Sequence, residues 1–552
     1  MKASMSAKDL IAPNIKGDVT DAPADLDVQS EDTSIFKIMP ELIVYPKDTE
    51  DVKTIVKLAL AHPGSFTITA RSAGTDMTGG PLTNSVVLNF TKYFNQVHAT
   101  SETEATTDPG VYYRDFDKET LKHGAILPSY TASRELNTVG GMVANNSGGE
   151  KSLTYGKTNR YVKKLKVVLA NGEEYELKKL TRAELEAKKA QNDFEGYFYR
   201  EMEALIRENQ SLIEREAPIV SKNSAGYYLW DVWDREADTF DLTQLIVGSQ
   251  GTLGLVTEIT FSLVRPKPAA RMLVLFLRKR HMAVLGDLVN TVLAEKPETF
   301  ESYDDKTFNV MLKVLPKLLR RIGGNPFTWV RDFWPEIKMV LTGGIPKLVL
   351  MAEFTADTDA EAAAMAERAE KAVKGKFKVT SHTTGSKEEG NKFWIIRRES
   401  FSLLRQNVSH EHTAPFIDDI AVRPEKLPEF LPELYATMGD YHLTYTIAGH
   451  IGDGNFHIIP LMDFSRPDFK QIIDELSKRV YKLVGKYHGS ITGEHNDGLI
   501  RTPFLGDMFS AEMLGLFRRT KDIFDPKRIL NPHKKVDADK DLLFASIKKQ
   551  TH

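Results

Sequence analysis

Three segments in the first half of the chain, each crowded with glycine and small hydroxyl residues, constrain its fold most. They are residues 71–80, 138–149 and 247–254. Glycine allows a backbone approach that a Cβ would block, and a row of backbone N–H groups between two strands binds phosphate oxygens. None of the three reads Gly-x-Gly-x-x-Gly or carries a Walker lysine. One such loop alone would be an ordinary surface turn, but three predict a site for a flat or anionic ligand.

A second motif, rich in histidine, lies in the last fifth of the chain. Residues 448–457 read Ala-Gly-His-Ile-Gly-Asp-Gly-Asn-Phe-His, and Gly-Glu-His follows at 493–495. Imidazole nitrogen and carboxylate oxygen are ligands of divalent cations such as zinc, and three protein ligands leave a position open for catalysis. The Gly-Asp-Gly-Asn turn can reverse the chain and bring His450 and His457 together.

The Gly-Glu-His segment adds a geometric condition. In a regular strand Glu494 and His495 would point to opposite faces. Both serve one site only if the backbone there is irregular, which Gly493 permits. A single histidine would more often be a structural residue, but three histidines and a glutamate in two glycine-bracketed segments favour a metal site.

The composition limits the classes of protein to which this chain can belong. The 552 residues suggest two or three domains, and the net charge of -3 gives no electrostatic case for nucleic acid. The sequence has no cysteine, which excludes disulfides and cysteine-ligated iron–sulfur clusters within it. The first thirty residues show no apolar signal-peptide core, and no run reaches the ~18–20 apolar residues of a spanning helix. The expected location is cytoplasmic.

Local patterns predict a mixed α+β fold. Asp48 is expected to cap a helix over 49–61, and Asn-Gly at 171–172 predicts a hairpin. Strands are expected at 42–45, 66–69, 86–90, 162–169, 174–177, 257–264, 271–277, 347–354, 417–422 and 443–449, and further helices at 280–294 and 359–374, the last ended by Gly375.

Three ordered matches carry a family resemblance. Residues 71–80, 138–148 and 248–258 resemble the flavin-binding domain of the vanillyl-alcohol-oxidase/p-cresol-methylhydroxylase superfamily. The resemblance implies FAD, with its pyrophosphate on the 71–80 loop and its ring near the other two segments. No cysteine exists and no histidine lies in that loop, so FAD is expected to be non-covalent. The cofactor-binding residues implied are Arg71, Ser72, Ala73, Gly74, Thr75, Thr78, Gly79, Pro128, Thr138, Gly140, Gly141, Ala144, Asn145, Ser147, Gly148, Gly251, Thr252, Gly254, Val256 and Asn531. Asp76 is expected to point away from the phosphates.

The second half resembles the D-lactate/glycolate/D-2-hydroxyglutarate dehydrogenase branch of the same superfamily. Trp394-x-x-Arg397, the 449–457 motif, Gly493-Glu-His495 and Leu530-Asn-Pro532 carry this match. It implies that His450, His457 and Glu494 hold a zinc or manganese ion, that His495 is the base, and that Arg397 binds the substrate carboxylate. This chain reads Glu-His-Asn-Asp-Gly where the commoner form reads Glu-His-Gly, a variant familiar in members fused to iron–sulfur domains.

These observations predict a two-part flavin domain of the p-cresol-methylhydroxylase type, an α+β cap and a C-terminal segment that returns to the flavin domain. The expected boundaries are a flexible leader at 1–33, the flavin domain at 34–268, the cap with the metal site at 269–500 and a helical segment at 501–552. Residues 308–347 form a basic, tryptophan-rich insertion in the cap. Its composition suits either a helical excursion packed on the cap or peripheral contact with the inner face of a membrane.

The predicted function is oxidation of a D-2-hydroxy acid, with D-lactate favoured, to the 2-keto acid. Electrons would leave to a quinone, a cytochrome or an iron–sulfur partner protein, because flavin can release them singly. Two alternatives stay open: a 2-hydroxy-acid oxidase that uses oxygen, and a non-redox flavoenzyme resembling alkylglycerone-phosphate synthase. A flavin-carrying scaffold subunit is a weaker alternative, since the metal motif is intact.

Overall fold

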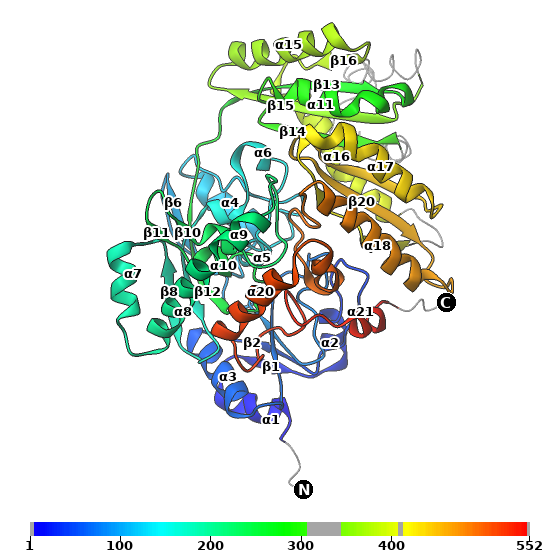
Figure 1. The fold of residues 1–552 in the computed structure, drawn as a ribbon. Helices are drawn as coiled ribbons and strands as arrows, with labels where there is room; N and C mark the ends of the chain where they lie inside the picture. The colour runs from blue at the N-terminus through cyan, green and yellow to red at the C-terminus, as the bar shows by residue number, and fades with distance from the viewer. Residues whose placement is uncertain (1–4, 306–343, 407–411, 549–552) are drawn as a thin grey trace.

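The computed structural model describes residues 5–305, 344–406 and 412–548. Its strands form four sheets. In Figure 1 the largest sheet and the helices that cover it lie at the top and right, and the other sheets lie below and to the left. The chain crosses between these two parts after β12 (Leu255–Ser262) and returns to the lower part in its last fifty residues.

The first sheet has the order β1-β2-β4-β3 and is parallel except for β1. Asp48 caps α3 by accepting a hydrogen bond from the amide of Asp51, as expected for an N-cap. Apolar residues of α3 pack on the sheet in a small core of their own. The elements are α1 (Ala7–Ile11), β1 (Asp18–Thr20), α2 (Pro23–Gln29), β2 (Leu42–Tyr45), α3 (Thr49–Ala61), β3 (Ile68–Arg71) and β4 (Val86–Asn89).

The second sheet is antiparallel in the order β5-β6-β12-β7-β8. The predicted Asn-Gly hairpin joins β7 and β8. The elements of this part are β5 (Val97–Thr100), β6 (Glu104–Thr107), α4 (Tyr113–Leu121), α5 (Val139–Asn145), α6 (Ser152–Tyr155), β7 (Val162–Val168), β8 (Glu174–Lys178), α7 (Arg182–Lys189), α8 (Phe194–Glu208), α9 (Gln210–Glu216), α10 (Thr243–Ile246) and β12 (Leu255–Ser262). A small sheet of β9 (Leu180–Thr181), β10 (Trp233–Asp234) and β11 (Thr239–Phe240) lies beside them.

The eight-stranded sheet has the order β16-β13-β15-β14-β19-β20-β17, with β18 paired to β20. Its elements are β13 (Ala269–Leu277), α11 (Leu285–Leu293), β14 (Thr299–Asp304), β15 (Leu348–Ala356), α15 (Asp359–Lys376), β16 (Thr380–Thr383), α16 (Lys387–Gln406), β17 (His412–Thr413), β18 (Ile420–Ala421), α17 (Leu427–Gly439), β19 (Tyr445–His450), β20 (Asn455–Met462) and α18 (Phe469–Lys486).

The alternation of side chains along β13 divides this sheet into two faces. Leu273, Leu275 and Leu277 pack in the core that includes residues of α11 and α15. Met272 and its alternate neighbours pack with Trp394 of α16 in a separate core. The second face also carries Tyr303 of β14 and Ala448 of β19, so it is the face from which the histidine motif projects.

The C-terminal segment returns to the first sheet, as predicted. It contains α19 (Gly498–Arg501), α20 (Ala511–Phe524) and α21 (Lys540–Ala545). Leu530 bridges to Ile68 of β3, and Ile547 bridges to Phe36. Figure 1 shows α21, in red, beside the blue N-terminal elements, whereas α20 packs against α8.

The flexible leader is the clearest error among the expectations. In the described residues 5–33, Ala7, Leu10 and Ile11 are buried, and β1 pairs with β2. The carboxylate of Asp51 accepts hydrogen bonds from the backbone N–H groups of Lys16 and Gly17 in the leader and of Lys47 before α3. The leader is therefore part of the first core, which its polar composition conceals.

Other differences are local. Gly375 does not end α15, because the helix continues to Lys376. The strand expected at 417–422 is only β18, and the first turns expected at 280–284 are a 3-10 helix before α11. Residues 308–343 of the basic insertion lie outside the described residues. Among the helices that the structure describes, none has the length and apolar character needed to cross a membrane.

Candidate active site

The predicted turn brings His450 and His457 together. β19 and β20 are antiparallel and joined by a 3-10 turn, with Gly454 in the left-handed region at φ 63°. His457 lies opposite Ala448, two residues before His450, so both imidazoles project from one face of the sheet. Their ring centroids are 5.3 Å apart.

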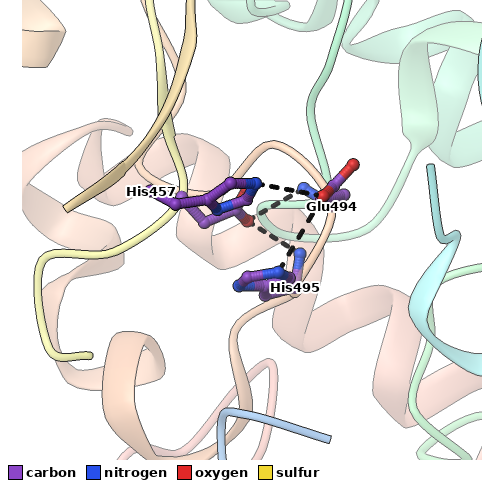
Figure 2. A group of neighbouring side chains, drawn as sticks. His457, Glu494 and His495 are labelled. Carbon is purple, nitrogen blue, oxygen red and sulfur yellow. Dashed lines mark hydrogen bonds and ion pairs between the residues drawn. The ribbon is translucent and has the colours of Figure 1, made fainter. Parts of the chain in front are cut away.

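One carboxylate oxygen is the focus of three imidazoles. Glu494 Oε1 lies 3.2 Å from His450 Nε2, 3.4 Å from His457 Nε2 and 3.9 Å from His495 Nε2. Figure 2 shows His457, Glu494 and His495 converging from two separate segments. The sequence therefore predicted a set of residues that the fold does bring together.

The outer nitrogen of each imidazole faces a buried carboxylate. Glu301 Oε1 lies 2.6 Å from His450 Nδ1. The two oxygens of Asp418 lie 3.1 Å from His457 Nδ1 and 3.0 Å from His495 Nδ1. A carboxylate partner keeps the proton on Nδ1 and leaves the Nε2 lone pair directed inward, as in carboxylate–histidine–metal arrangements.

The backbone of the Gly-Glu-His segment is irregular, as its chemistry requires. Asp419 Oδ2 accepts hydrogen bonds from the amides of Glu494 (2.9 Å) and His495 (2.7 Å), which turns both side chains toward one site. Gly493 is needed for space: a Cβ there would lie 2.8 Å from Asn455 Nδ2.

Three buried lysines hold this loop from other parts of the chain. Lys157 Nζ donates to the carbonyl of Gly493 at 2.7 Å, and Lys222 Nζ lies 3.0 Å from Glu494 Oε2. Lys535 Nζ lies 2.7 Å from a carboxylate oxygen of Asp497. Burial lowers the pKa of Lys157 to about 7 despite the nearby acids. Lys157 and Lys222 belong to the part of the chain that carries the glycine-rich segments, and Lys535 belongs to the C-terminal segment.

The donor set suits a divalent cation. Asp419, His457, Glu494 and His495 offer ligand atoms within 4.8 Å of one another. Asp419 Oδ2 already accepts three hydrogen bonds, the third from Thr492 Oγ1, so we regard it as a scaffold rather than a ligand. The inward Nε2 atoms and Glu494 Oε1 remain as donors.

The pKa shifts of the buried acids and histidines also favour a cation at this site. Burial raises the pKa of Asp418, but His495 and His457 outweigh it and leave that pKa well below its usual range. Burial opposes the charged form of His457, yet the carboxylates of Asp418 and Glu494 raise its pKa to about 10. Carboxylates gathered so closely stabilise positive charge, which either a proton or a metal ion supplies.

Arg397 reaches the site from α16. Its guanidinium is buried and forms an ion pair with Glu301, the same carboxylate that contacts His450. It also lines the pocket described next. A guanidinium fixed on one side and facing a cavity is suited to bind a carboxylate.

A single pocket joins the two sequence motifs. It is lined by residues from the segments 70–77, 140–148 and 249–256 at one end and by Arg397, His450, His457, Glu494 and His495 at the other. Thirteen of the cofactor-binding residues expected from the sequence line it: Arg71, Ser72, Gly74, Thr75, Gly140, Gly141, Ala144, Asn145, Ser147, Gly148, Gly251, Gly254 and Val256.

Comparison with known proteins identifies the family. Residues 40–178 match the FAD binding domain, and residues 267–535 match the C-terminal domain of FAD linked oxidases. The chain belongs to the FAD-linked oxidases. It is 28% identical over 529 residues to a D-2-hydroxyglutarate dehydrogenase of Pseudomonas putida, covering 94% of this chain and 50% of that one. It is 27% identical to a D-lactate dehydrogenase of Archaeoglobus fulgidus, covering 90% of this chain and 91% of that one.

The fold of this FAD-linked oxidase is that of the p-cresol-methylhydroxylase type, as the sequence predicted. A structure of p-cresol methylhydroxylase with bound substrate matches with a TM-score of 0.65 and 14% identity, covering 96% of each chain. The chain spans about half the length of the D-2-hydroxyglutarate dehydrogenase it matches.

The glycine-rich end of the pocket fits FAD. Arg71 is buried, and its Nη1 has no hydrogen-bond partner among the described residues. Gly74, at φ 72°, leaves room for that guanidinium, since a Cβ would lie 2.4 Å from Arg71 Nη2. A buried cation with an unused donor beside a cleft suits a phosphate.

Part of the 71–80 loop forms hydrogen bonds within the protein. Asp76 lines the pocket, and its carboxylate accepts hydrogen bonds from the amides of Thr78 and Gly80. The carboxylate of Asp32 accepts a hydrogen bond from the amide of Gly79. The N–H groups of Thr78, Gly79 and Gly80 are therefore not free to bind a phosphate, and the predicted phosphate contacts fall to the other residues of the loop.

Seven other expected cofactor residues, Ala73, Thr78, Gly79, Pro128, Thr138, Thr252 and Asn531, are not among the residues that line the pocket. Thr138 caps α5, and Asn531 donates to the carbonyls of Gly80 and Gln250, so these two support the lining residues.

The sequence interpretation missed Glu301 and Asp418, because a lone acid in a strand or turn gives no signal until the fold places it beside a histidine.

Proposed function

We propose that this chain is an FAD- and metal-dependent dehydrogenase that oxidises a D-2-hydroxy acid to the 2-keto acid. The observation that carries the proposal is the single pocket that runs from the glycine-rich segments to three inward imidazoles, Glu494 and Arg397. A binding module would need no such cluster at the far end of a flavin pocket. The names of the relatives, D-2-hydroxyglutarate dehydrogenase and D-lactate dehydrogenase, support the same reaction class.

Each residue at the substrate end has a role in this proposal. Arg397 binds and orients the substrate carboxylate. His495 takes the hydroxyl proton on Nε2, because Asp418 holds its Nδ1. His450, His457 and Glu494 would hold a zinc or manganese ion, which lowers the pKa of a coordinated hydroxyl. FAD, when bound, supplies the acceptor for the hydride.

D-lactate is the favoured substrate. The described residues that line this end of the pocket include one guanidinium, that of Arg397. One guanidinium suits an acid with a single carboxylate. The electron acceptor proposed is a quinone, a cytochrome or a partner protein, and peripheral contact with the inner face of a membrane through residues 308–347 remains part of this proposal.

An anaerobic titration tests the proposal. The flavin absorbance is followed while D-lactate, glycolate, D-2-hydroxyglutarate and their L-isomers are added, before and after treatment with a chelator. Bleaching by a D-acid that chelation abolishes is the expected result. Bleaching that is insensitive to chelation would remove the metal from the reaction, and peroxide formation in air would indicate the oxidase alternative. No bleaching by any acid would favour the non-redox alternative.

A further inference from the structure

We propose that Glu301 is a positioning residue that joins the substrate-binding guanidinium to the metal site. One of its carboxylate oxygens contacts His450 Nδ1 at 2.6 Å, and the other pairs with Arg397. The inference rests on the proposed metal site and goes beyond it, because Glu301 touches neither the metal nor the substrate in that proposal.

The location of Glu301 suits this role. It lies on β14, whose residues Ser302 and Tyr303 pair with Gly449 and Ala448 of β19. Continuing this register places Glu301 opposite His450 on the same face of the sheet. The side chain is 1% exposed, so water does not compete for its oxygens. Side chains packed on paired strands are held more rigidly than those on loops.

The chemistry at its two ends differs. At His450 the carboxylate accepts a hydrogen bond from the Nδ1–H group, so the Nε2 lone pair faces Glu494 and the other imidazoles. At Arg397 the carboxylate occupies one part of the guanidinium and fixes the direction of the rest. A buried glutamate between two partners also avoids the cost of an unpaired charge.

A linkage follows from this arrangement. A substrate carboxylate that draws Arg397 toward itself leaves more of the negative charge of Glu301 on His450, which makes that imidazole a stronger ligand. Metal affinity and carboxylate affinity are therefore expected to be coupled through Glu301, and such coupling is reciprocal.

The test is the zinc affinity of the flavin-loaded protein, measured by competition with a chromophoric chelator in the absence of substrate. Glu301→Gln keeps the shape but removes the charge and is expected to weaken zinc binding by about 10–100-fold, as for other carboxylates behind a histidine ligand. Glu301→Asp keeps the charge and is expected to lose less. The FAD content should not change.

Glu353→Gln is the matched control. Glu353 lies on the neighbouring strand β15, and its carboxylate accepts a hydrogen bond from Trp394 Nε1 at 2.7 Å. This change removes a buried carboxylate charge from the same sheet without touching a metal ligand. Zinc affinity should therefore stay within about twofold of the wild type, since only carboxylates that orient a ligand contribute to it.

The outcomes separate the two proposals. Equal zinc affinity of the wild type and Glu301→Gln would overturn the role of Glu301 while leaving the metal site in place. If Glu301→Gln does not fold, a zinc affinity of Glu301→Asp equal to that of the wild type would overturn it as well. A wild type without measurable zinc or manganese affinity would remove both this inference and the metal from the proposed function.

Discussion

Asp418→Asn is the most informative single change, because one carboxylate faces two histidines with different roles. Its oxygens lie 3.1 Å from His457 Nδ1 and 3.0 Å from His495 Nδ1, and it is fully buried. Asparagine offers one acceptor and one donor in the same space. One histidine would then face an N–H group and would have to move its own proton to Nε2.

Either result of that tautomer change is damaging. If His457 changes, its Nε2 cannot bind a metal ion. If His495 changes, its Nε2 cannot accept the substrate proton. Loss of the carboxylate behind a metal ligand costs about 10–100-fold in affinity, and loss of the one behind a catalytic histidine costs about 10⁴-fold in rate. The latter corresponds to about 5 kcal/mol of transition-state stabilisation.

The assay is the rate of flavin reduction by D-lactate in anaerobic stopped-flow mixing at saturating zinc. We expect Asp418→Asn to retain FAD and to be reduced at least about 100-fold more slowly. Asp241→Asn is the control, because Asp241 is a buried carboxylate that accepts hydrogen bonds from Thr243 and Gln244, and none of these three residues lines the pocket. Reduction of Asp418→Asn at the wild-type rate, with unchanged zinc affinity, would refute the reasoning.

Four further changes test other parts of the structure. His495→Ala should keep FAD but lose reduction by substrate, and unchanged reduction would remove it from the base role. Gly74→Ala places a Cβ against Arg71 at a φ of 72° and should weaken FAD binding through about 1–3 kcal/mol of strain, measured as the FAD dissociation constant; equal affinity would contradict that contact. Asp51→Ala leaves three backbone N–H groups without their acceptor and should cost about 1–3 kcal/mol in urea unfolding, whereas a flexible leader would predict no change. Burial opposes the charged form of His457, but nearby carboxylates raise its pKa to about 10 from 6.5, so metal-stripped protein should lose stability as pH rises from 6.5 to 10; thermal unfolding that does not change over that window would contradict it.

The sequence by itself determined the local features of this protein. Glycine spacing, the Asp48 cap, the Asn-Gly hairpin and the strands expected at 257–264 and 271–277 are short-range properties, and each appears in the structure. The two chemical motifs were also readable, because glycine, histidine and glutamate in fixed spacing restrict the chemistry that a segment can perform.

The error at the N-terminus shows where such reading fails. Residues 5–33 are polar overall, yet three apolar side chains of α1 enter the core of the first sheet. Their burial depends on β2 and α3, which no local pattern in the leader indicates. The average polarity of a segment therefore does not show how far it is buried when its few apolar residues pack against another part of the chain.

Tertiary structure alone decided how the site is assembled. Glu301 comes from β14, Asp418 from the turn before β18, and Lys222 from the segment after α9. Glu301 contacts His450, Asp418 contacts His457, and Lys222 contacts Glu494. Isolated acids and a lysine are common in any sequence and carry no pattern. Their effect depends on distances of about 3 Å and on burial, because Coulomb and hydrogen-bond energies grow as water is excluded. Only the folded chain fixes those two quantities.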